Sequence, residues 1–504
     1  MTRTSQHPSH RTVALALSGA LMLAACGGGG GDAGVSPFPG SGGSSGGGGS
    51  SGGSSIPASS QSAGRLINSS VSGALPEHWV ASTCTTDRQR SWVRSIVHEK
   101  HLFYRQVPNI NPASYTGTPQ NLFYELTRFG IPNNRDRFSF VIPQSTASAT
   151  FEQGQGVGIG AVYVYDAQGR LRVAYVEPGS PAAGQLDRGA QIVSINGAIV
   201  GNSLTSAQID ALYPSAASGT IALQVRDTPA GATRSITLTN TAYSISPVNR
   251  SLVLPGNVGY LHYTDFTTPS GQIQLADTFS TFATVGITDL IVDLRYNGGG
   301  YLAIAAQLGH MVAGSRGANR TFERLVYSDK RSSENVSVPF YSQHFDLPGY
   351  NNPRVGQTLP TLNLSRVFVL TTGDSCSASE SFINAMKGVD VPVIQIGGTT
   401  CGKPYGFTQY PNCTYAYFPI EFEGRNDRNQ SFPSTGITPT CAVPDDLDAP
   451  LGLPGEALLD AALSYQATGQ CPVLATAQSR IPLPGVKVGS PEPDSPRRIK
   501  LVTP

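Results

Sequence analysis

The 504-residue sequence has little charge and almost no excess of one sign. It holds 34 Lys and Arg against 33 Asp and Glu, so charged residues make up 13% and the formal net charge is +1. Without a broad basic field, the chain lacks the electrostatic footprint of a nucleic-acid-binding protein. After residue 26 it also lacks long apolar runs, so no later segment is expected to span a bilayer.

The first residues differ from the rest in composition. Arg3 and Arg11 accompany an apolar run at 13–23, which is too short to span a bilayer. The run ends in LAAC at 23–26, which resembles the bacterial lipobox, so Cys26 would be lipidated and become the mature N-terminus. Because Gly27 rather than Asp follows, the resemblance implies the periplasmic face of the outer membrane. An ordinary Ala-rich signal cleavage site is the alternative.

Six further cysteines lie in the part of the chain that would be exported. They are Cys84, Cys376, Cys401, Cys413, Cys441 and Cys471. An even number in an exported chain predicts up to three disulfides but leaves their connectivity open. We favour the pairs Cys376–Cys401 and Cys413–Cys441. Metal binding is the competing interpretation, but CxxC spacing and paired histidines are missing, so we expect no metal.

Composition and periodicity divide the remaining sequence into segments. After a signal peptide of residues 1–25, residues 26–65 are rich in Gly and Ser, which predicts a flexible tether. Residues 66–150 show helical periodicity interrupted by prolines, which predicts a small α-helical N-terminal unit. Residues 472–504 are Pro-rich and unpatterned, as expected of a loose tail.

Residues 151–245 alternate apolar and polar positions in short runs, which predicts a compact β-rich module. Three runs resemble a PDZ domain: GVGIG at 156–160, VEPGSPA at 176–182 and GAQIVSING at 189–197. The resemblance implies a peptide-binding site at Gly158, Ile159 and Gly160. Their backbone N–H groups would hold a C-terminal carboxylate while the peptide adds as a strand. A structural module that binds nothing is the alternative.

Residues 246–471 alternate strands with helices, which predicts a mixed α/β core and makes the whole chain an α/β (α+β) multidomain protein. Two segments share one design. A strand at 287–294 runs into RYNGGG at 295–300 and then a helix, and a strand at 367–370 runs into TTGDSCS at 371–377 and then a helix. If the two strands are parallel, both loops lie at the edge where such sheets bind ligands.

Ser377 has two interpretations. The run from Ser377 to Glu380 fits S-x-x-E, so the hydroxyl could simply cap a helix. As a nucleophile, it would instead use N–H groups from the helix start and from the glycines at 298–300 to stabilise an anion. The sequence has no GxSxG elbow and no evident Ser/His/Asp order. Ser375 stands in a Gly-Asp-Ser run like that of chymotrypsin-like enzymes, but the rest of that pattern is missing.

Lys403 is the candidate base. It follows a strand at 391–396, which itself follows the helix after Ser377. A right-handed strand–helix–strand crossover would return the chain beside its start and bring Lys403 to the Ser377 loop. A lysine acts as a base only if its pKa is lowered, and Tyr405 and Phe407 could form the apolar wall that desolvates it. A solvated loop lysine is the alternative.

Five motifs occur in order: DRFS at 136–139, DLRYNGGG at 293–300, SCSASE at 375–380, GKP at 402–404 and GITP at 436–439. Together they resemble the carboxy-terminal processing, or tail-specific, serine proteases over roughly residues 84–470. That resemblance implies a PDZ domain ahead of a catalytic core and a Ser/Lys dyad acting through an acyl-enzyme. The middle serine of the run, Ser377, would be the nucleophile rather than Ser375 or Ser379, with Lys403 lying 26 residues further on.

The same resemblance implies an oxyanion hole formed by backbone N–H groups of Ala378 and of Gly299 or Gly300. It implies protein or peptide substrates with accessible C-termini, and no cofactor. The oligomeric state is left open.

Two departures from the family pattern leave rival interpretations open. Cys376 replaces the usual alanine, and Phe407 stands where the family often has a glutamine that orients the lysine. Gln409 is the substitute we predict for that glutamine. The rivals are a non-catalytic peptide-binding lipoprotein that retains the protease fold, and a Ser/His hydrolase.

Overall fold

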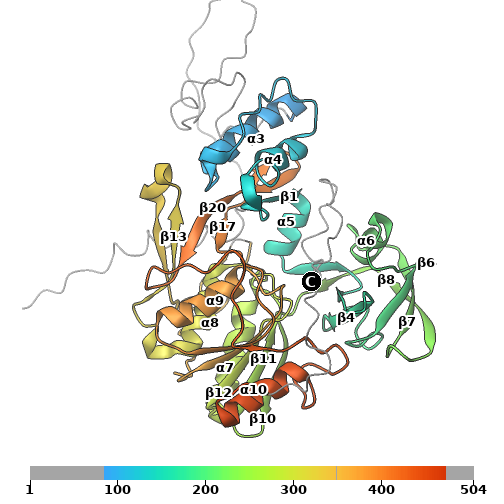
Figure 1. The fold of residues 1–504 in the computed structure, drawn as a ribbon, viewed down its shortest axis with the longest axis vertical. Coiled ribbons are helices and arrows are strands. Elements are labelled where there is room, and N and C mark those ends of the chain that lie inside the picture. Colours follow the sequence, from blue (N-terminus) through green and yellow to red (C-terminus); the bar gives the residue numbers. More distant parts are fainter. Residues whose placement is uncertain (1–83, 348, 473–504) are drawn as a thin grey trace, which may run out of the picture.

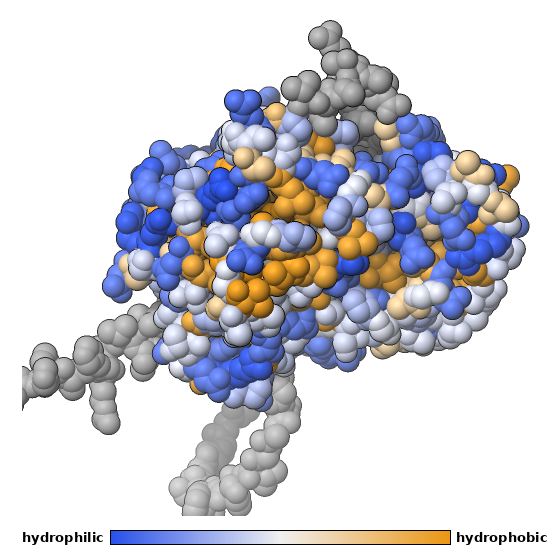
Figure 2. All heavy atoms as spheres, turned by 90° about the horizontal axis from the view of Figure 1, so that it is seen from below, coloured by the Kyte–Doolittle hydropathy of each residue, from blue (hydrophilic) through white to orange (hydrophobic). Residues whose placement is uncertain are grey.

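The computed structural model describes residues 84–347 and 349–472. The predicted signal peptide, the lipidation site Cys26 and the tether lie outside the described residues, as does nearly all of the predicted tail. Within the described part, no helix is long and apolar enough to cross a membrane. Figure 2 shows hydrophobic residues gathered in the middle of one face, with hydrophilic residues around them.

The described N-terminal residues contain several short helices, and they are not separate from the core. Its elements are α3 (Thr86–Lys100), η1 (Tyr104–Gln106), α4 (Pro119–Leu126), η2 (Pro132–Asn134), β1 (Phe140–Pro143) and α5 (Gln144–Phe151). Strand β1 pairs with β19 (Tyr415–Phe418), which also pairs with β18 (Tyr410–Asn412). Trp92 of α3 packs against Tyr417, with ring centroids 5.3 Å apart. Residues far along the chain therefore complete the helical unit.

Residues 151–245 form the β-rich module. Its elements are β2 (Gln155–Gly158), β3 (Ala161–Tyr165), β4 (Leu171–Val176), β5 (Gln191–Ile195), β6 (Ala198–Ile199), α6 (Ser206–Leu212), β7 (Thr220–Arg226), β8 (Thr233–Thr239) and β9 (Thr241–Ser244). The main sheet has the order β3-β4-β5-β7-β8, so β3 lies at an edge. Gly158 and Gly160 have φ values of 118° and 75°, which favour glycine, and Ile159 between them is buried.

The core is built on a six-stranded sheet of order β10-β11-β12-β15-β16-β21. Its elements are β10 (Val248–Leu254), β11 (Val258–Tyr263), α7 (Gly271–Val285), β12 (Asp289–Asp293), α8 (Leu302–Ala313), η3 (Gly314–Arg316), β15 (Val367–Thr371), α9 (Ala378–Gly388), β16 (Val393–Gly397), β21 (Cys441–Ala442) and α10 (Ala457–Thr468). All pairs after β10–β11 are parallel. The predicted crossover is confirmed, since β15, α9 and β16 return the chain beside its start.

Alternate side chains of these strands enter two apolar layers. On one face, Val292 and Val369 belong to the cluster that includes residues of α7, α8 and α9. On the other face, Ile291 and Phe368 pack with residues of α10. Figure 1 shows α10 at the end of the molecule opposite α3. Strands covered on both faces explain the near-continuous apolar runs in the sequence.

A second sheet of order β14-β13-β20-β17 flanks α9. Its elements are β13 (Thr321–Tyr327), η4 (Asp329–Glu334), which follows β13, β14 (Val336–Pro339), β17 (Tyr405–Phe407) and β20 (Ile420–Arg425). Gly424 of β20 donates its N–H to the Pro404 carbonyl, which fixes the chain just after Lys403 to this sheet.

The disulfide predictions are half right. Cys376–Cys401 forms as expected, but Cys413 does not pair with Cys441. Cys413 pairs with Cys84, 329 residues away, and Cys441 pairs with Cys471. The fold determines these pairs. The β18–β19 turn, which carries Cys413, lies at the start of α3 near Cys84, and β21, which carries Cys441, lies by the end of α10 near Cys471. Their Cα atoms are 5.8 and 5.5 Å apart, within the reach of a disulfide.

A buried charge cluster fixes the start of the glycine-rich loop. Arg295, fully buried, pairs with Asp293, Asp445 and Glu456. Burial alone would raise the pKa of Asp293, but the Arg295 guanidinium outweighs it and lowers that pKa to about 2. Arg188 of the β-rich module also pairs with Asp445, at 2.8 Å. The cluster therefore ties the module, the core and the loop at 295–300 together.

Candidate active site

Ser377 occupies the sharp turn between β15 and α9. Its backbone is left-handed, with φ 56° and ψ −112°, a conformation that costs a residue other than glycine about 1–3 kcal/mol. A strained strand-to-helix turn of this kind presents its side chain at the sheet edge. It also leaves the first N–H groups of the helix without helical partners. A hydroxyl at this position therefore lies close to potential oxyanion donors.

The two neighbouring serines of the run have structural partners. The Ser375 hydroxyl donates to the Leu294 carbonyl at 2.8 Å, and the Ser379 hydroxyl donates to the Asn297 carbonyl at 3.0 Å. Both side chains are fully buried. Among the three serines, Ser377 is the one that lines the adjoining cavity. The geometry thus separates one candidate nucleophile from two residues that fasten the turn to the glycine-rich loop.

Gly299 lies directly against the Ser377 turn. A Cβ atom at position 299 would come within 2.8 Å of Ser377 Cβ, and its φ is 100°, so only glycine fits. The predicted oxyanion donors differ in availability. The Gly299 N–H donates to Asn297 Oδ1 at 2.9 Å. Within the described chain, the N–H groups of Ala378 and Gly300 have no hydrogen-bond acceptor, so these two can serve a substrate.

The carboxylate of Glu380 joins the loops that carry Ser377 and Lys403. Its Oε2 accepts the Ser377 N–H at 3.0 Å and the Lys403 N–H at 2.8 Å. Its Oε1 accepts the Gly402 N–H at 2.8 Å and the Thr400 hydroxyl. Burial raises the pKa of Glu380, and these donors oppose the rise. The Glu380 carboxylate therefore positions the backbone of both Ser377 and Lys403.

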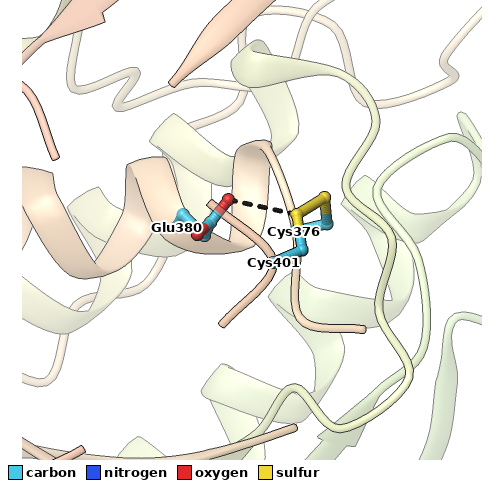
Figure 3. Close-up of side chains that lie close together, drawn as sticks. All are labelled: Cys376, Glu380 and Cys401. Atoms are coloured by element: carbon cyan, nitrogen blue, oxygen red, sulfur yellow. Dashed lines mark hydrogen bonds between the residues drawn. A yellow bond between two sulfur atoms is a disulfide. The ribbon is translucent and has the colours of Figure 1, made fainter. Parts of the chain in front are cut away.

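The Cys376–Cys401 disulfide is a second link between the same loops. Figure 3 shows it beside Glu380, whose Oε2 lies 3.5 Å from Cys401 Sγ. The two Sγ atoms and a carboxylate oxygen of Glu380 all lie within 4.8 Å of one another. Metal sites use cysteine as a thiolate, whereas these two sulfurs are bonded to each other. In this state the cluster is a covalent brace rather than a ligand set.

Lys403 lies in apolar surroundings. Its Nζ is 4.0 Å from the ring centroid of Phe407 and 5.9 Å from that of Phe138. Burial lowers the pKa of Lys403 to about 7, although the charges of Asp136 and Glu380 pull it upward. No carboxylate in the described chain forms an ion pair with it. The predicted apolar wall at Phe407 is therefore present.

Ser377 and Lys403 line the same cavity, which has a volume of about 390 Å³. No histidine is among the described residues that line it. His262 is fully buried beside Asn249, and burial lowers its pKa to about 4. Among the described residues, a lysine and no histidine thus lines the cavity of the candidate nucleophile.

Gln409 has a different neighbour from the one predicted. It is buried, and its amide donates to Gln144 Oε1 at 3.2 Å. No hydrogen bond joins it to Lys403 within the described chain. Phe407, the last residue of β17, instead places its ring centroid 4.0 Å from Lys403 Nζ.

Arg137 is a supporting residue whose role the sequence did not reveal. Its guanidinium donates to the carbonyls of Cys401 and Ser434, at 2.8 Å each. It therefore fixes the backbone two residues before Lys403. Its place in the DRFS motif was the available signal, but only the fold shows which loop it contacts.

Comparison with known proteins relates part of the chain to a peptidase family. The profile of peptidase family S41 matches residues 257–443. A candidate S41 protease from Bacteroides fragilis has a similar structure, with 26% identity and a TM-score of 0.58 over 75% of this chain and 97% of that one.

Two further structures are more distant. The photosystem II D1 C-terminal processing protease shows 16% identity and a TM-score of 0.43, over 72% of this chain and 94% of its own. Mature CPAF complexed with lactacystin shows 13% identity and a TM-score of 0.39, over 72% and 94%. No curated protein matches the sequence. Residues 257–443 are thus similar to peptidase family S41, a family of serine-type peptidases.

Proposed function

We propose that this chain is a serine endopeptidase that hydrolyses peptide bonds of exported proteins with a dyad of Ser377 and Lys403. The carrying observation is the Lys403 pKa, lowered by burial to about 7, in a cavity that Ser377 also lines. A lysine with that pKa is largely neutral just above neutral pH and can accept a proton. The Ser377 turn supplies the nucleophile's position and the nearby N–H donors.

The reaction follows from these positions. Lys403 Nζ takes the proton of the Ser377 hydroxyl as Oγ bonds to the scissile carbonyl carbon. The N–H groups of Ala378 and Gly300 donate to the resulting oxyanion. The Lys403 ammonium then protonates the leaving amine as the C–N bond breaks, which leaves an acyl-enzyme. Water attacks this ester, Lys403 accepts its proton, and the acid departs as Ser377 Oγ regains a hydrogen.

The β-rich module is proposed to bind substrate C-termini in the manner of a PDZ domain. Its strand β3 lies at a sheet edge, directly after the loop at Gly158–Gly160. Tyr175 and Glu177, at the end of β4 and just after it, line the same cavity as Ser377. A peptide held at β3 is therefore close to the site that would cleave it.

Export is also part of the proposal. The described residues hold three disulfides, which favours an oxidising compartment. Lipid anchoring at Cys26 and the outer-membrane location stay predictions from the sequence. The rival function is a non-catalytic peptide-binding lipoprotein, and Phe407 in place of an orienting glutamine is the observation that favours it.

Removing either member of the dyad should abolish peptidase activity. We expect Ser377→Ala and Lys403→Ala each to lower kcat/KM for casein-derived peptides by about 10³-fold or more. Ser333→Ala and Lys387→Ala are matched controls, because both side chains are exposed, and they should retain wild-type rates. Equal activity in all variants would refute the dyad, and no activity in any protein, wild type included, would favour the binding lipoprotein.

The pH dependence should report the Lys403 base. Burial lowers its pKa to about 7, and only the neutral amine accepts a proton. We therefore expect kcat/KM to rise with pH, reach half its maximum near this pKa and level off above it. The measurement is kcat/KM from pH 5 to 9 with an uncharged substrate. A flat profile, or one that falls as the pH rises, is inconsistent with Lys403 as the base.

The Cys376–Cys401 disulfide should support catalysis. Without it, the Ser377 and Lys403 loops would be held together by Glu380 and by the hydrogen bond from the Cys401 N–H to the Ser375 carbonyl. Misplacement of reacting groups by about 1 Å can cost roughly 10²-fold, so we expect Cys376→Ala/Cys401→Ala to lower kcat by about 10-fold to 10²-fold. The control is Cys441→Ala/Cys471→Ala, which breaks a disulfide elsewhere. Wild-type kcat in the first variant, with its fold confirmed by circular dichroism, would refute this role.

Binding to the module should require a free C-terminus. Backbone N–H groups at Gly158–Gly160 would hold a carboxylate, and losing such charge-assisted bonds costs about 1.5–3 kcal/mol each. We expect peptides with an amidated C-terminus to bind at least about 10-fold more weakly than the same peptides with a free carboxylate. Calorimetry on the Ser377→Ala chain measures this without turnover. Equal affinities would argue against carboxylate capture.

A further inference from the structure

A buried acidic residue that the dyad does not use lines the same cavity. Glu323 of β13 is 5% exposed and contributes to the cavity wall together with Ser377. The same cavity is lined by apolar side chains, namely Phe140, Phe151, Leu302, Phe407 and Phe422, and also by the acidic residues Glu177, Asp265 and Asp374. A buried carboxyl group on an apolar wall is costly unless it has a partner or a task.

Two neighbours place the Glu323 carboxyl group between β20 and α9. A Cβ atom at position 424 would come within 1.8 Å of Glu323 Oε1, so the glycine there makes room for the carboxyl group. The hydroxyl of Ser381, on α9, lies close enough to the carboxyl group to lower its pKa. Ser381 lies one helical turn after Ser377, and its N–H donates to the Ser377 carbonyl at 2.8 Å. The carboxyl group therefore lies near the first turn of α9, which begins at the candidate nucleophile.

The charge of Glu323 is not balanced within the described chain. No Lys or Arg in the described residues forms an ion pair with it. Burial raises its pKa to about 7, and the Ser381 hydroxyl opposes only part of that rise. A carboxylate has room for about four hydrogen bonds, so acceptor sites remain for a ligand.

We infer that Glu323 makes the cavity select a basic side chain, Lys or Arg, on the substrate residue whose carbonyl Ser377 attacks. The inference rests on the proposed function. The long aliphatic stem of such a side chain would pack on the phenylalanine rings, which also attract a cation. Its charged end would reach the carboxyl group near the first turn of α9 and supply the missing counter-charge. A carboxylate-bearing side chain would be repelled at the same place.

Uncharged side chains of the same length are the sharpest comparison. Methionine fills a similar volume and favours the aromatic wall, but it leaves Glu323 buried without a counter-charge. Tyrosine could donate one hydrogen bond to the carboxyl group but brings no charge. The basic residue is favoured because it alone satisfies both the apolar wall and the unpaired acid.

The test measures kcat/KM of the full chain, purified in detergent, on quenched fluorescent peptides that differ only at the residue before the cleaved bond. That residue is Lys, Arg, Met, Tyr or Glu. We expect Lys and Arg to exceed Met by about 10-fold to 10²-fold. Glu323→Gln should bring the Lys/Met ratio close to one with little change for Met. Glu323→Asp should restore part of the ratio, and Glu125→Gln, at an exposed position, should leave it unchanged.

The pH dependence of the ratio separates a charge contact from a structural role. Protonation of Lys403 affects every substrate equally and cancels in the Lys/Met ratio. The ratio should therefore rise with pH through about 7 in the wild type, as Glu323 ionises, and stay flat in Glu323→Gln.

Met or Tyr cleaved as well as Lys by the wild type would overturn the inference while leaving the dyad intact. A Lys/Met ratio unchanged in Glu323→Gln would also overturn it. If wild type and Ser377→Ala cleave none of the peptides, the proposed function fails, and this inference fails with it.

Discussion

The Glu380 carboxylate is the constraint on which the geometry of the site depends. Ser377 and Lys403 come from loops at the ends of different strands, and neither loop has regular structure of its own. Glu380 accepts a backbone N–H from each of these residues, at 3.0 and 2.8 Å. Charge-assisted hydrogen bonds of this kind are stronger than neutral ones. One side chain, at the third position of α9, thereby holds both loops in register.

The parallel sheet makes this arrangement possible. Strands β12, β15 and β16 are neighbours and point the same way, so their following loops meet at one edge. Gly299 then allows the first loop to approach the Ser377 turn more closely than any side chain would permit. The strained backbone of Ser377 is fastened on both sides, by the disulfide of Cys376 and by the first turn of α9. Local strain is thus held by contacts from distant segments.

Much of this was predictable from patterns that are local in the sequence. The strand–loop–helix design recurs in both halves of the site, and the crossover from β15 to β16 follows from chain handedness. The pair Cys376–Cys401 joins the two loops that this crossover brings together. The pair predicted for Cys413 was wrong because its true partner, Cys84, lies 329 residues away in the helical unit. No local pattern encodes that docking.

The missed side chains have the same explanation. Arg137 reaches the site from the loop before β1, and its motif does not show which loop it contacts. The pairing of β13 with β20 sets where Glu323 lies. Gln409 was placed by its distance from Lys403 along the chain, but the end of β17 turns its side chain toward Gln144. Spacing along a strand or helix is a reliable guide, whereas spacing across a strand end is not.

One physical cause, removal of water from the cavity, acts on two of the ionisable groups that line it. Burial penalises whichever form carries charge, so it lowers the pKa of the Lys403 amine and raises that of the Glu323 acid. The pKa of Lys403 falls to about 7, and the pKa of Glu323 rises to about 7. A neutral lysine can act as a base. An acid whose pKa is near the ambient pH loses its proton at little cost in free energy when a cation enters the cavity. The same apolar wall that would activate the nucleophile would therefore also make the pocket beside it responsive to a substrate's charge.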